Sequence, residues 1–292
     1  MRSHSLIPCT RASHFSSARL GCLVLTLLGF LALESEAEAK TKFHLFDPTP
    51  PGLMREMNTD RPDTTESPYT VDAGHFQLEM SFFDYQCSRD SGLRGDAWSF
   101  GQINFKAGLC HNTDVQLVFN AYDTARVTGF GGTTSMSGFA DVTVRLKTNI
   151  WGNEDGKTAL ALMPYFVAPT GGPVGSDEWG GGLIVPLSVG LTDSVSLNLM
   201  LQADLVPDVV AGGYDVAWIH TASLGIALTE RLGSYVELVG VAGSGGLNYQ
   251  ALFNTGLTLS VSDNLIFDAG IRVGLNDDTP DLGVFTGVSI RY

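Results

Sequence analysis

The stretch SVSLNLMLQAD, from Ser194 to Asp204, decides the fold class of this 292-residue chain. Valine, leucine and alanine occupy every second position from 195 to 203, and mostly polar residues fill the positions between them. An alternation of period two places these two sets on opposite faces of a β-strand. The stretch therefore predicts a long strand with one apolar face and one mostly polar face.

The same alternation recurs in HFQLEMSFF (75–83), ADVTVRLK (140–147) and NLIFDAGIRVGL (264–275). Many of the expected strands have ten or more residues, which is longer than the usual globular strand of about 5–6 and suits a tilted membrane-spanning strand of about 9–11. This length favours a membrane barrel over a soluble sandwich, which would alternate as well. The twelve expected strands lie near 74–85, 96–108, 114–123, 138–149, 158–168, 181–190, 194–206, 214–228, 234–242, 248–261, 264–275 and 283–292.

The connections between these strands fall into two classes. Those after even-numbered strands are mostly short, such as LTD and SD, whereas those after odd-numbered strands are mostly longer and rich in glycine. Bacterial outer-membrane barrels show this asymmetry, with short periplasmic turns and longer outside loops. In lipid every backbone polar group must be paired, so the sheet must close on itself. We therefore predict an all-β, closed antiparallel transmembrane β-barrel of about twelve strands with both termini periplasmic.

The N-terminal region has the pattern of an export signal. Residues 1–39 combine a basic start, the apolar run Leu20–Leu33 and the small-residue motif AEA at 37–39, so we expect a cleaved signal peptide. Residues 40–73 then form a periplasmic or luminal lead-in, and residues 74–292 form the outer-membrane barrel. No later segment has 18 continuous apolar residues, so no spanning helix is expected.

Charge and composition exclude several functions. The net charge of −14 argues against nucleic acid as a partner, because nucleic acid demands a basic surface. No nucleotide-binding motif is present, and we expect no cofactor. Cys87 and Cys110 are the cysteines that remain after signal cleavage, and they lie at opposite ends of a predicted strand. We expect both to be free thiols, because a disulfide needs Cα atoms within about 7 Å.

The titratable residues offer little support for an enzyme or a metal site. His220 and Ser223 are three positions apart and therefore point to opposite faces of a strand, so no nucleophile–base pair is expected. The alternation aims His220 at lipid, unless a bulge shifts the register or the residue sits near an interface. The loop NDDTPD (276–281) has three carboxylates without the spacing of a calcium loop, and a solvated turn is the favoured interpretation. We predict no catalytic and no metal site.

The polar strand faces carry charged residues that we expect to line or constrict the lumen. Neighbouring strands would bring Glu79 to Lys106, Asp268 to Arg291, and Arg291 to Glu79 across the closing seam. The alternative is that these charges merely satisfy one another and fill the interior. The lumen candidates are Glu79, Lys106, Asp141, Arg145, Lys147, Asp204, Asp268, Arg272 and Arg291.

Aromatic residues cluster near the expected strand ends. An interfacial girdle accounts for this distribution, and ligand stacking is the weaker alternative. The aromatic residues concerned are Trp98, Phe130, Trp151, Tyr165, Trp179, Tyr214 and Tyr292.

Four stretches resemble a known family. They are NTDRPDTTESPYTVDAGHFQLE (58–79), GFADVTVRLKTNIWGNEDG (138–156), ALALMPYFVAPTG (159–171) and FDAGIRVGLNDD (267–278). They are similar to bacterial outer-membrane proteins labelled with the meta-pathway of phenol degradation and often described as transporters. The resemblance spans roughly 58–292. It implies a β-barrel and suggests passage of small hydrophobic or aromatic molecules, and it implies no catalytic residues.

The first of these stretches precedes the first strand and is the most recognisable part of the resemblance. Pro62 and Pro68 make a helix or a central strand unfavourable there. Because of the resemblance we expect an ordered lead-in that caps or plugs the periplasmic mouth, with Arg61 paired to a carboxylate. The plug or gate candidates are Asp60, Arg61, Asp63 and Glu66.

The function predicted from the sequence is passive passage of small solutes through an outer-membrane channel or transporter. The alternative is a non-conducting structural or binding barrel that recognises ligands through its outer loops. The expected partners are outer-membrane lipid, a small-molecule solute and the barrel-assembly machinery.

Overall fold

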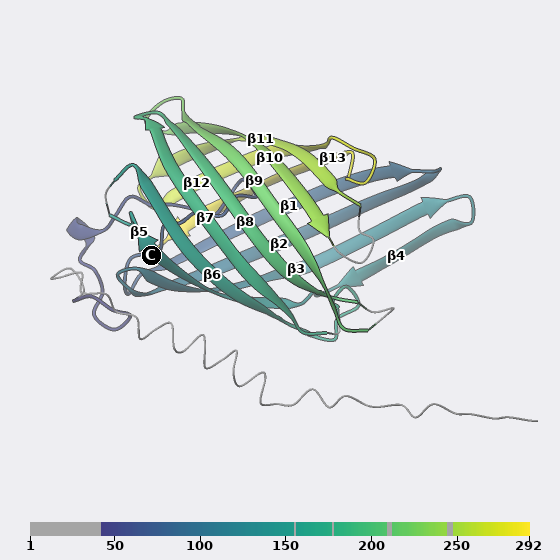
Figure 1. Ribbon diagram of the computed structural model, residues 1–292, viewed down its shortest axis with the longest axis horizontal. Helices are drawn as coiled ribbons and strands as arrows, with labels where there is room; N and C mark the ends of the chain where they lie inside the picture. Colours follow the sequence, from purple (N-terminus) through teal and green to yellow (C-terminus); the bar gives the residue numbers. More distant parts are fainter. Residues whose placement is uncertain (1–41, 155, 177, 209–211, 244–247) are drawn as a thin grey trace, which may run out of the picture. The chain divides into compact units, whose positions relative to one another are not determined.

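The computed structural model describes residues 42–154, 156–176, 178–208, 212–243 and 248–292, and the expected signal at 1–39 lies outside them (Figure 1). Residues 40–292 form one compact unit. The described residues of this unit form one short 3₁₀ turn, η1 (Pro51–Leu53), and thirteen strands. None of the described helices is long and apolar enough to cross a membrane.

The strands follow one another along the sheet and pair antiparallel. Their bounds are β1 (Phe76–Asp90), β2 (Leu93–Cys110), β3 (Thr113–Gly129), β4 (Gly132–Gly138), β5 (Val142–Trp151), β6 (Thr158–Ala168), β7 (Gly180–Thr192), β8 (Val195–Pro207), β9 (Tyr214–Ala227), β10 (Leu232–Gly243), β11 (Gln250–Ser262), β12 (Leu265–Gly274) and β13 (Leu282–Arg291).

The sheet closes into a barrel. Strand β1 pairs with both β2 and β13, β2 pairs with β3, and β5 pairs with the first part of β3. Twelve strands therefore form the ring, and β4 pairs with the far part of β3 alone. The prediction of a closed antiparallel barrel of twelve strands is confirmed, with β4 as an extra strand. The periplasmic location of both termini stays a prediction.

The connection expected between the strands near 114–123 and 138–149 is not a loop, because its residues pair as the β3–β4 hairpin. Strand β2 has 18 residues and β3 has 17, and in Figure 1 the β1–β2 and β3–β4 hairpins reach farther than the other strands. The turn between β1 and β2 is also tight. Ser91 and Gly92 have φ values of 49° and 82°, which is the left-handed pair that a two-residue hairpin turn requires. The other connections follow the predicted asymmetry, with short turns at the end that holds Tyr292.

The barrel is polar inside and apolar outside. Lys147, Glu79, Gln116 and Glu237 are among its largest fully buried side chains, with exposed fractions of 0–1%. The alternate positions of the strands place large apolar side chains on the outer surface, where Leu201 is 51% exposed. A water-soluble protein has the opposite arrangement. The interior therefore depends on hydrogen bonds and ion pairs, and its contacts define the candidate site.

Candidate functional site

Residues 55–73, here called the luminal segment, lie inside the barrel and form neither helix nor strand. The segment contacts inward-facing side chains from ten strands, including opposite sides of the ring. Its wall partners are Glu79 (β1), Lys106 (β2), Asp114 and Gln116 (β3), Arg145 and Lys147 (β5), Met200 (β8), Thr221 (β9), Glu237 (β10), Asn254 (β11), Asp268 (β12) and Arg291 (β13).

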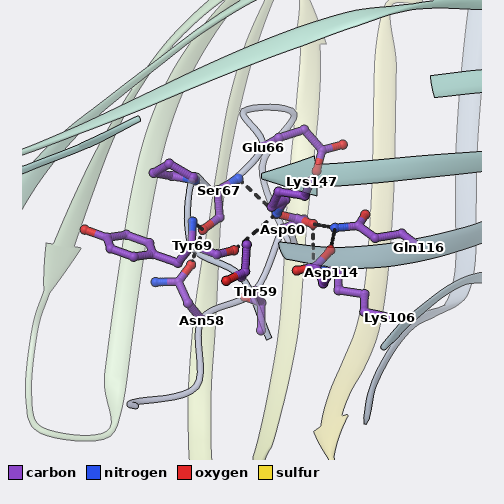
Figure 2. Close-up of polar contacts among 12 residues, drawn as sticks. Asn58, Thr59, Asp60, Glu66, Ser67, Tyr69, Lys106, Asp114, Gln116 and Lys147 are labelled. Carbon is purple, nitrogen blue, oxygen red and sulfur yellow. Dashed lines mark hydrogen bonds and ion pairs between the residues drawn. The ribbon is translucent and has the colours of Figure 1, made fainter. Parts of the chain in front are cut away.

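Asp60 is the most densely paired residue of the luminal segment (Figure 2). Its two carboxylate oxygens lie 2.5 Å from the ammonium groups of Lys106 and Lys147, and its backbone N–H donates to Glu79 at 3.1 Å. Lys106 also pairs with Glu79. Burial would raise the pKa of Asp60, but the two lysines hold it well below its usual value. Asp60 is therefore a charged carboxylate that joins β1, β2 and β5.

Asp60 also folds the segment back on itself. The N–H of Ser67 donates to Asp60 Oδ1 at 3.0 Å, and the Ser67 hydroxyl bonds to the side chain of Asn58. Figure 2 shows these residues on the two limbs of one loop, with the barrel lysines beyond Asp60. The segment thus presents a compact loop to the wall, not an extended chain.

Arg61 extends the contacts of the segment from β1 to β12. Its guanidinium forms a bidentate pair with Asp268 on β12, at 2.6 and 3.0 Å, and donates to the hydroxyl of Ser81 on β1 at 2.5 Å. The wall makes room for it at Gly287, where an added Cβ would lie 2.4 Å from Arg61 Nη2. The arginine predicted to pair with a carboxylate does so in the structure, and Asp268 is its partner.

Glu237 binds the tip of the segment. It accepts hydrogen bonds from the N–H groups of Thr64 and Thr65 at 2.9 and 2.7 Å, and from Asn254 Nδ2 at 2.7 Å. Backbone N–H groups buried away from water need such acceptors. Because side chains of the wall supply these hydrogen-bond acceptors, the segment docks without adding a strand to the sheet.

Two acidic residues of the segment lie near this tip. Burial, and then the neighbouring Glu237 carboxylate, raises the pKa of Asp63 to about 8. Burial also raises the pKa of Glu66, although Arg145 opposes this shift through an ion pair of 2.7 Å. Asp63 therefore holds a proton at neutral pH, and the protonated Asp63 does not repel the neighbouring Glu237 carboxylate.

A second cluster holds the base of the segment near the C-terminus. Arg55 pairs with Asp72 at 2.8 Å, and Arg291 donates to the backbone oxygen of Arg55 at 2.8 Å. The N–H of Val71 donates to Asp114 at 3.0 Å. At Gly108 an added Cβ would lie 2.0 Å from the Asp72 oxygen, so only glycine lets the chain approach β2 so closely.

The nine predicted lumen residues have different outcomes. Six contact the luminal segment, namely Glu79, Lys106, Arg145, Lys147, Asp268 and Arg291. Arg272 faces inward but pairs with Asp84 at 2.8 Å and lies over the Phe285 ring. Asp204 accepts from the Tyr165 hydroxyl and from Gln202.

Asp141 is not a lumen residue. It precedes β5 at the barrel end opposite Tyr292 and accepts from the N–H groups of Thr170 and Ser176 at 3.1 and 2.7 Å. Its carboxylate therefore shapes the loop between β6 and β7, because the strand that would have turned it inward begins one residue later, at Val142.

The predicted pairings of Arg291 are also wrong. Glu79 does meet Lys106, but Arg291 meets Asp72 at 3.5 Å, and Asp268 meets Arg61. In the register, Arg291 lies opposite Gln77, and Asp268 lies opposite Gly287. The luminal segment therefore takes the partners that adjacent strands were expected to share.

Tyr165 differs from the other predicted girdle aromatics, because its hydroxyl bonds to the inward-facing Asp204. Trp151, Trp179 and Tyr292 are 49%, 49% and 66% exposed, as expected for an outer surface. His220 faces outward, as its position in the alternation predicts, and its ring stacks on Tyr249 at 5.8 Å.

Ser223 is fully buried on the opposite face from His220. Cys87 and Cys110 are free thiols on β1 and at the far end of β2. No group of three His, Cys, Asp or Glu side chains that could hold a metal ion is found in the described ranges.

Sequence reasoning missed several wall residues of the site. Glu237, Asp114 and Asn254 lie at the polar alternate positions of their strands. This alternation could have identified them as inward-facing residues. Glu237 shares its alternate positions with Tyr235, Val239 and Val241, so the polar face of that strand is hard to recognise, and the sequence does not show which polar residues the luminal segment will reach.

Replacement of Arg61 by Met should loosen the luminal segment. The change leaves the buried Asp268 carboxylate unpaired, a loss that typically costs about 3–5 kcal/mol. We expect the Thr64 and Thr65 amides to exchange hydrogen about a hundredfold faster or more, measured by hydrogen–deuterium exchange. The matched control is Arg89→Met, at an exposed arginine on β1. Unchanged exchange in the Arg61 variant would contradict the role given to this pair.

The solved structures that resemble this chain include porins and a transporter. NanC porin is 9% identical with a TM-score of 0.48, over 74% of this chain and 98% of that chain. KdgM porin is 11% identical with a TM-score of 0.44, over 71% and 97%. The toluene transporter TbuX of Ralstonia pickettii is 9% identical with a TM-score of 0.41, over 74% and 88%. A search of curated proteins found no match.

A family model gives the firmer result. The model described as "Putative MetA-pathway of phenol degradation" matches residues 59–292, which covers the whole barrel and most of the luminal segment. The match begins at Thr59, immediately before Asp60 and Arg61, the two residues that anchor the segment to the wall. The chain belongs to this family.

Proposed function

We propose that this protein is an outer-membrane channel for the passive passage of small solutes, and that the luminal segment is its gate. The observation that carries the proposal is the position of residues 55–73, a segment without regular structure bound inside a closed barrel by ion pairs. The family description names phenol degradation, which supports small aromatic or hydrophobic compounds as solutes.

The outer surface supports a location in the outer membrane. Large apolar side chains cover it, and soluble monomers rarely expose so much contiguous apolar surface. A closed barrel satisfies its own backbone hydrogen bonds, as lipid demands. Twelve strands give a barrel of intermediate diameter, which leaves room for one polypeptide segment or a modest pore.

The way in which the segment is bound supports a gate over a permanent core. Each wall strand is paired on both sides, so the ring stays closed when the segment leaves. The segment is held by charged side chains, and such charges regain hydration when water enters the lumen. In a dry core the same groups would stay unpaired at a cost of several kcal/mol each.

A second candidate is a non-conducting binding barrel. The observation that favours it is the β3–β4 hairpin, which reaches beyond the rest of the ring and offers a surface for recognition (Figure 1). The two candidates differ in whether the lumen ever opens, and permeation separates them.

A variant lacking residues 40–70 should assemble as a barrel and conduct more current than the full mature chain. The deletion removes the obstruction and leaves all thirteen strands intact. Single-channel recording in planar bilayers measures the current, and heat-dependent migration in gels checks that the barrel has folded. A folded variant without current would favour the binding barrel. Current equal to that of the mature chain would show that the segment does not block.

Channel opening should increase with pH through Asp63. Docking raises the pKa of Asp63 from 3.8 to about 8, so the docked state binds a proton that the free segment releases. Docking therefore weakens as pH rises from about 4 to 8 and changes little above that range. We expect greater open probability at pH 8.5 than at pH 6, and no such change in Asp63→Asn. An equal pH response in both proteins would exclude Asp63 as the cause.

A further inference from the structure

One part of the lumen wall is apolar. Met163 on β6, Ile184 on β7 and Met200 on β8 form a buried cluster with exposed fractions of 0%, 1% and 4%, and Tyr165 and Ile219 pack against it. We call these five residues the luminal apolar patch. Their alternate positions match the inward phase of β6–β9, the phase that includes Asp204 and the buried Ser223. The patch therefore faces the lumen and not the outer surface.

The luminal segment is a poor partner for this patch. Elsewhere its backbone N–H groups reach strong acceptors, such as the carboxylates of Glu79 and Glu237. Glu66, in contrast, directs its N–H to the sulfur of Met200 at 3.4 Å, and a thioether is a weak acceptor. An interior built to hold a polar segment would have a polar residue there. The hydrogen bond that the segment makes to the patch is therefore weaker than those it makes to Glu79 and Glu237.

Hydrogen-bonding groups lie beside the patch. The Tyr165 hydroxyl donates to Asp204, and Gln202 Nε2 donates to Asp204 at 2.8 Å and lies 3.4 Å from the Tyr165 oxygen. Gly182 gives this hydroxyl its space, since an added Cβ would lie 2.7 Å from it. Across the strand pair, Arg145 is directly opposite Tyr165. An apolar surface therefore adjoins a small set of directed donors and acceptors, the combination that small-molecule sites use.

We propose that the luminal apolar patch is a binding site for small uncharged amphiphiles, with an apolar body against Met163, Ile184 and Met200 and a hydroxyl group at the Tyr165–Asp204 edge. This inference rests on the proposed function and names the solute class. Methionine side chains adapt to bodies of different shape. A hydroxyl group can donate to Asp204 and accept from Gln202. Anions are disfavoured because the Asp204 carboxylate lies at that edge of the patch.

The site is covered in the docked state. Glu66 lies against Met200, and none of the three cluster residues is more than 4% exposed. A solute therefore reaches the patch after this part of the luminal segment moves, and solute and segment compete. The variant lacking residues 40–70 should accordingly bind the solute more tightly than the full mature chain.

Ligand-observed NMR titrations of the protein in nanodiscs test the site, with benzyl alcohol as the probe and benzoate as its anionic counterpart. We expect saturable binding of benzyl alcohol, with benzoate at least about tenfold weaker. Met163→Gln/Met200→Gln should weaken benzyl alcohol binding about tenfold or more. The matched control is Val118→Gln, a similar change on β3 away from the patch. Equal affinity of the double variant and the control would overturn the proposal, as would benzoate binding as tightly as benzyl alcohol.

A second variant tests the polar edge. Tyr165→Phe should retain toluene binding and lose about fivefold or more of the preference for benzyl alcohol over toluene, because the edge loses its hydroxyl. An unchanged preference would overturn the assignment of that edge. Conductance of the 40–70 deletion separates this inference from the proposed function. Current without saturable binding defeats the site alone, and binding without current defeats the channel alone.

Discussion

The interior of this barrel depends on the pairing of buried charges, and Asp60 is the centre of that pairing. Two lysines from β2 and β5 reach its carboxylate, and Glu79 of β1 binds both Lys106 and the Asp60 N–H. Removal of two or three charges from water costs several kcal/mol each, so they remain buried only where each has a partner. The luminal segment supplies the partners that the wall lacks. Lys147, fully buried, would otherwise face an empty lumen.

This chemistry suits the proposed gate, which needs docking that is both strong and reversible. A charge that loses its partner inside a hydrocarbon core cannot be hydrated. A charge that faces a barrel lumen is hydrated, because water enters as the segment leaves. The backbone pairing of the wall is complete without the segment. In the proposed gate, opening exchanges ion pairs for hydration and leaves the fold unchanged. The binding site proposed at the apolar patch on β6–β9 would favour a partly apolar solute over the luminal segment in the same lumen.

The alternation of residues predicted which face each strand presents, and so the inward position of residues such as Glu79, Lys147 and Asp268. It also predicted that Glu79 meets Lys106, but not the partner of Asp268, because Arg61 and Asp268 are 207 positions apart and meet through the path of a segment without regular structure. The β4 strand was missed because GTTSMSG has no apolar alternation. Tyr165 was assigned to the outer girdle because it lies near a strand end, and the alternation did not correct this because ALALMPYFVA (159–168) is apolar on both faces. That same uniformity concealed the luminal apolar patch.

The central claim is that charge pairing holds the luminal segment in the pore, and a charge exchange at Arg61 and Asp268 tests it most directly. Single-channel conductance would be recorded for Arg61→Asp, for Asp268→Arg and for the double variant. Each single change places like charges in contact, so both should raise the open probability. The double change restores an opposite pair and should return the channel to its mostly closed state. A double variant that stays as open as the single variants, or single variants that stay closed, would contradict the account.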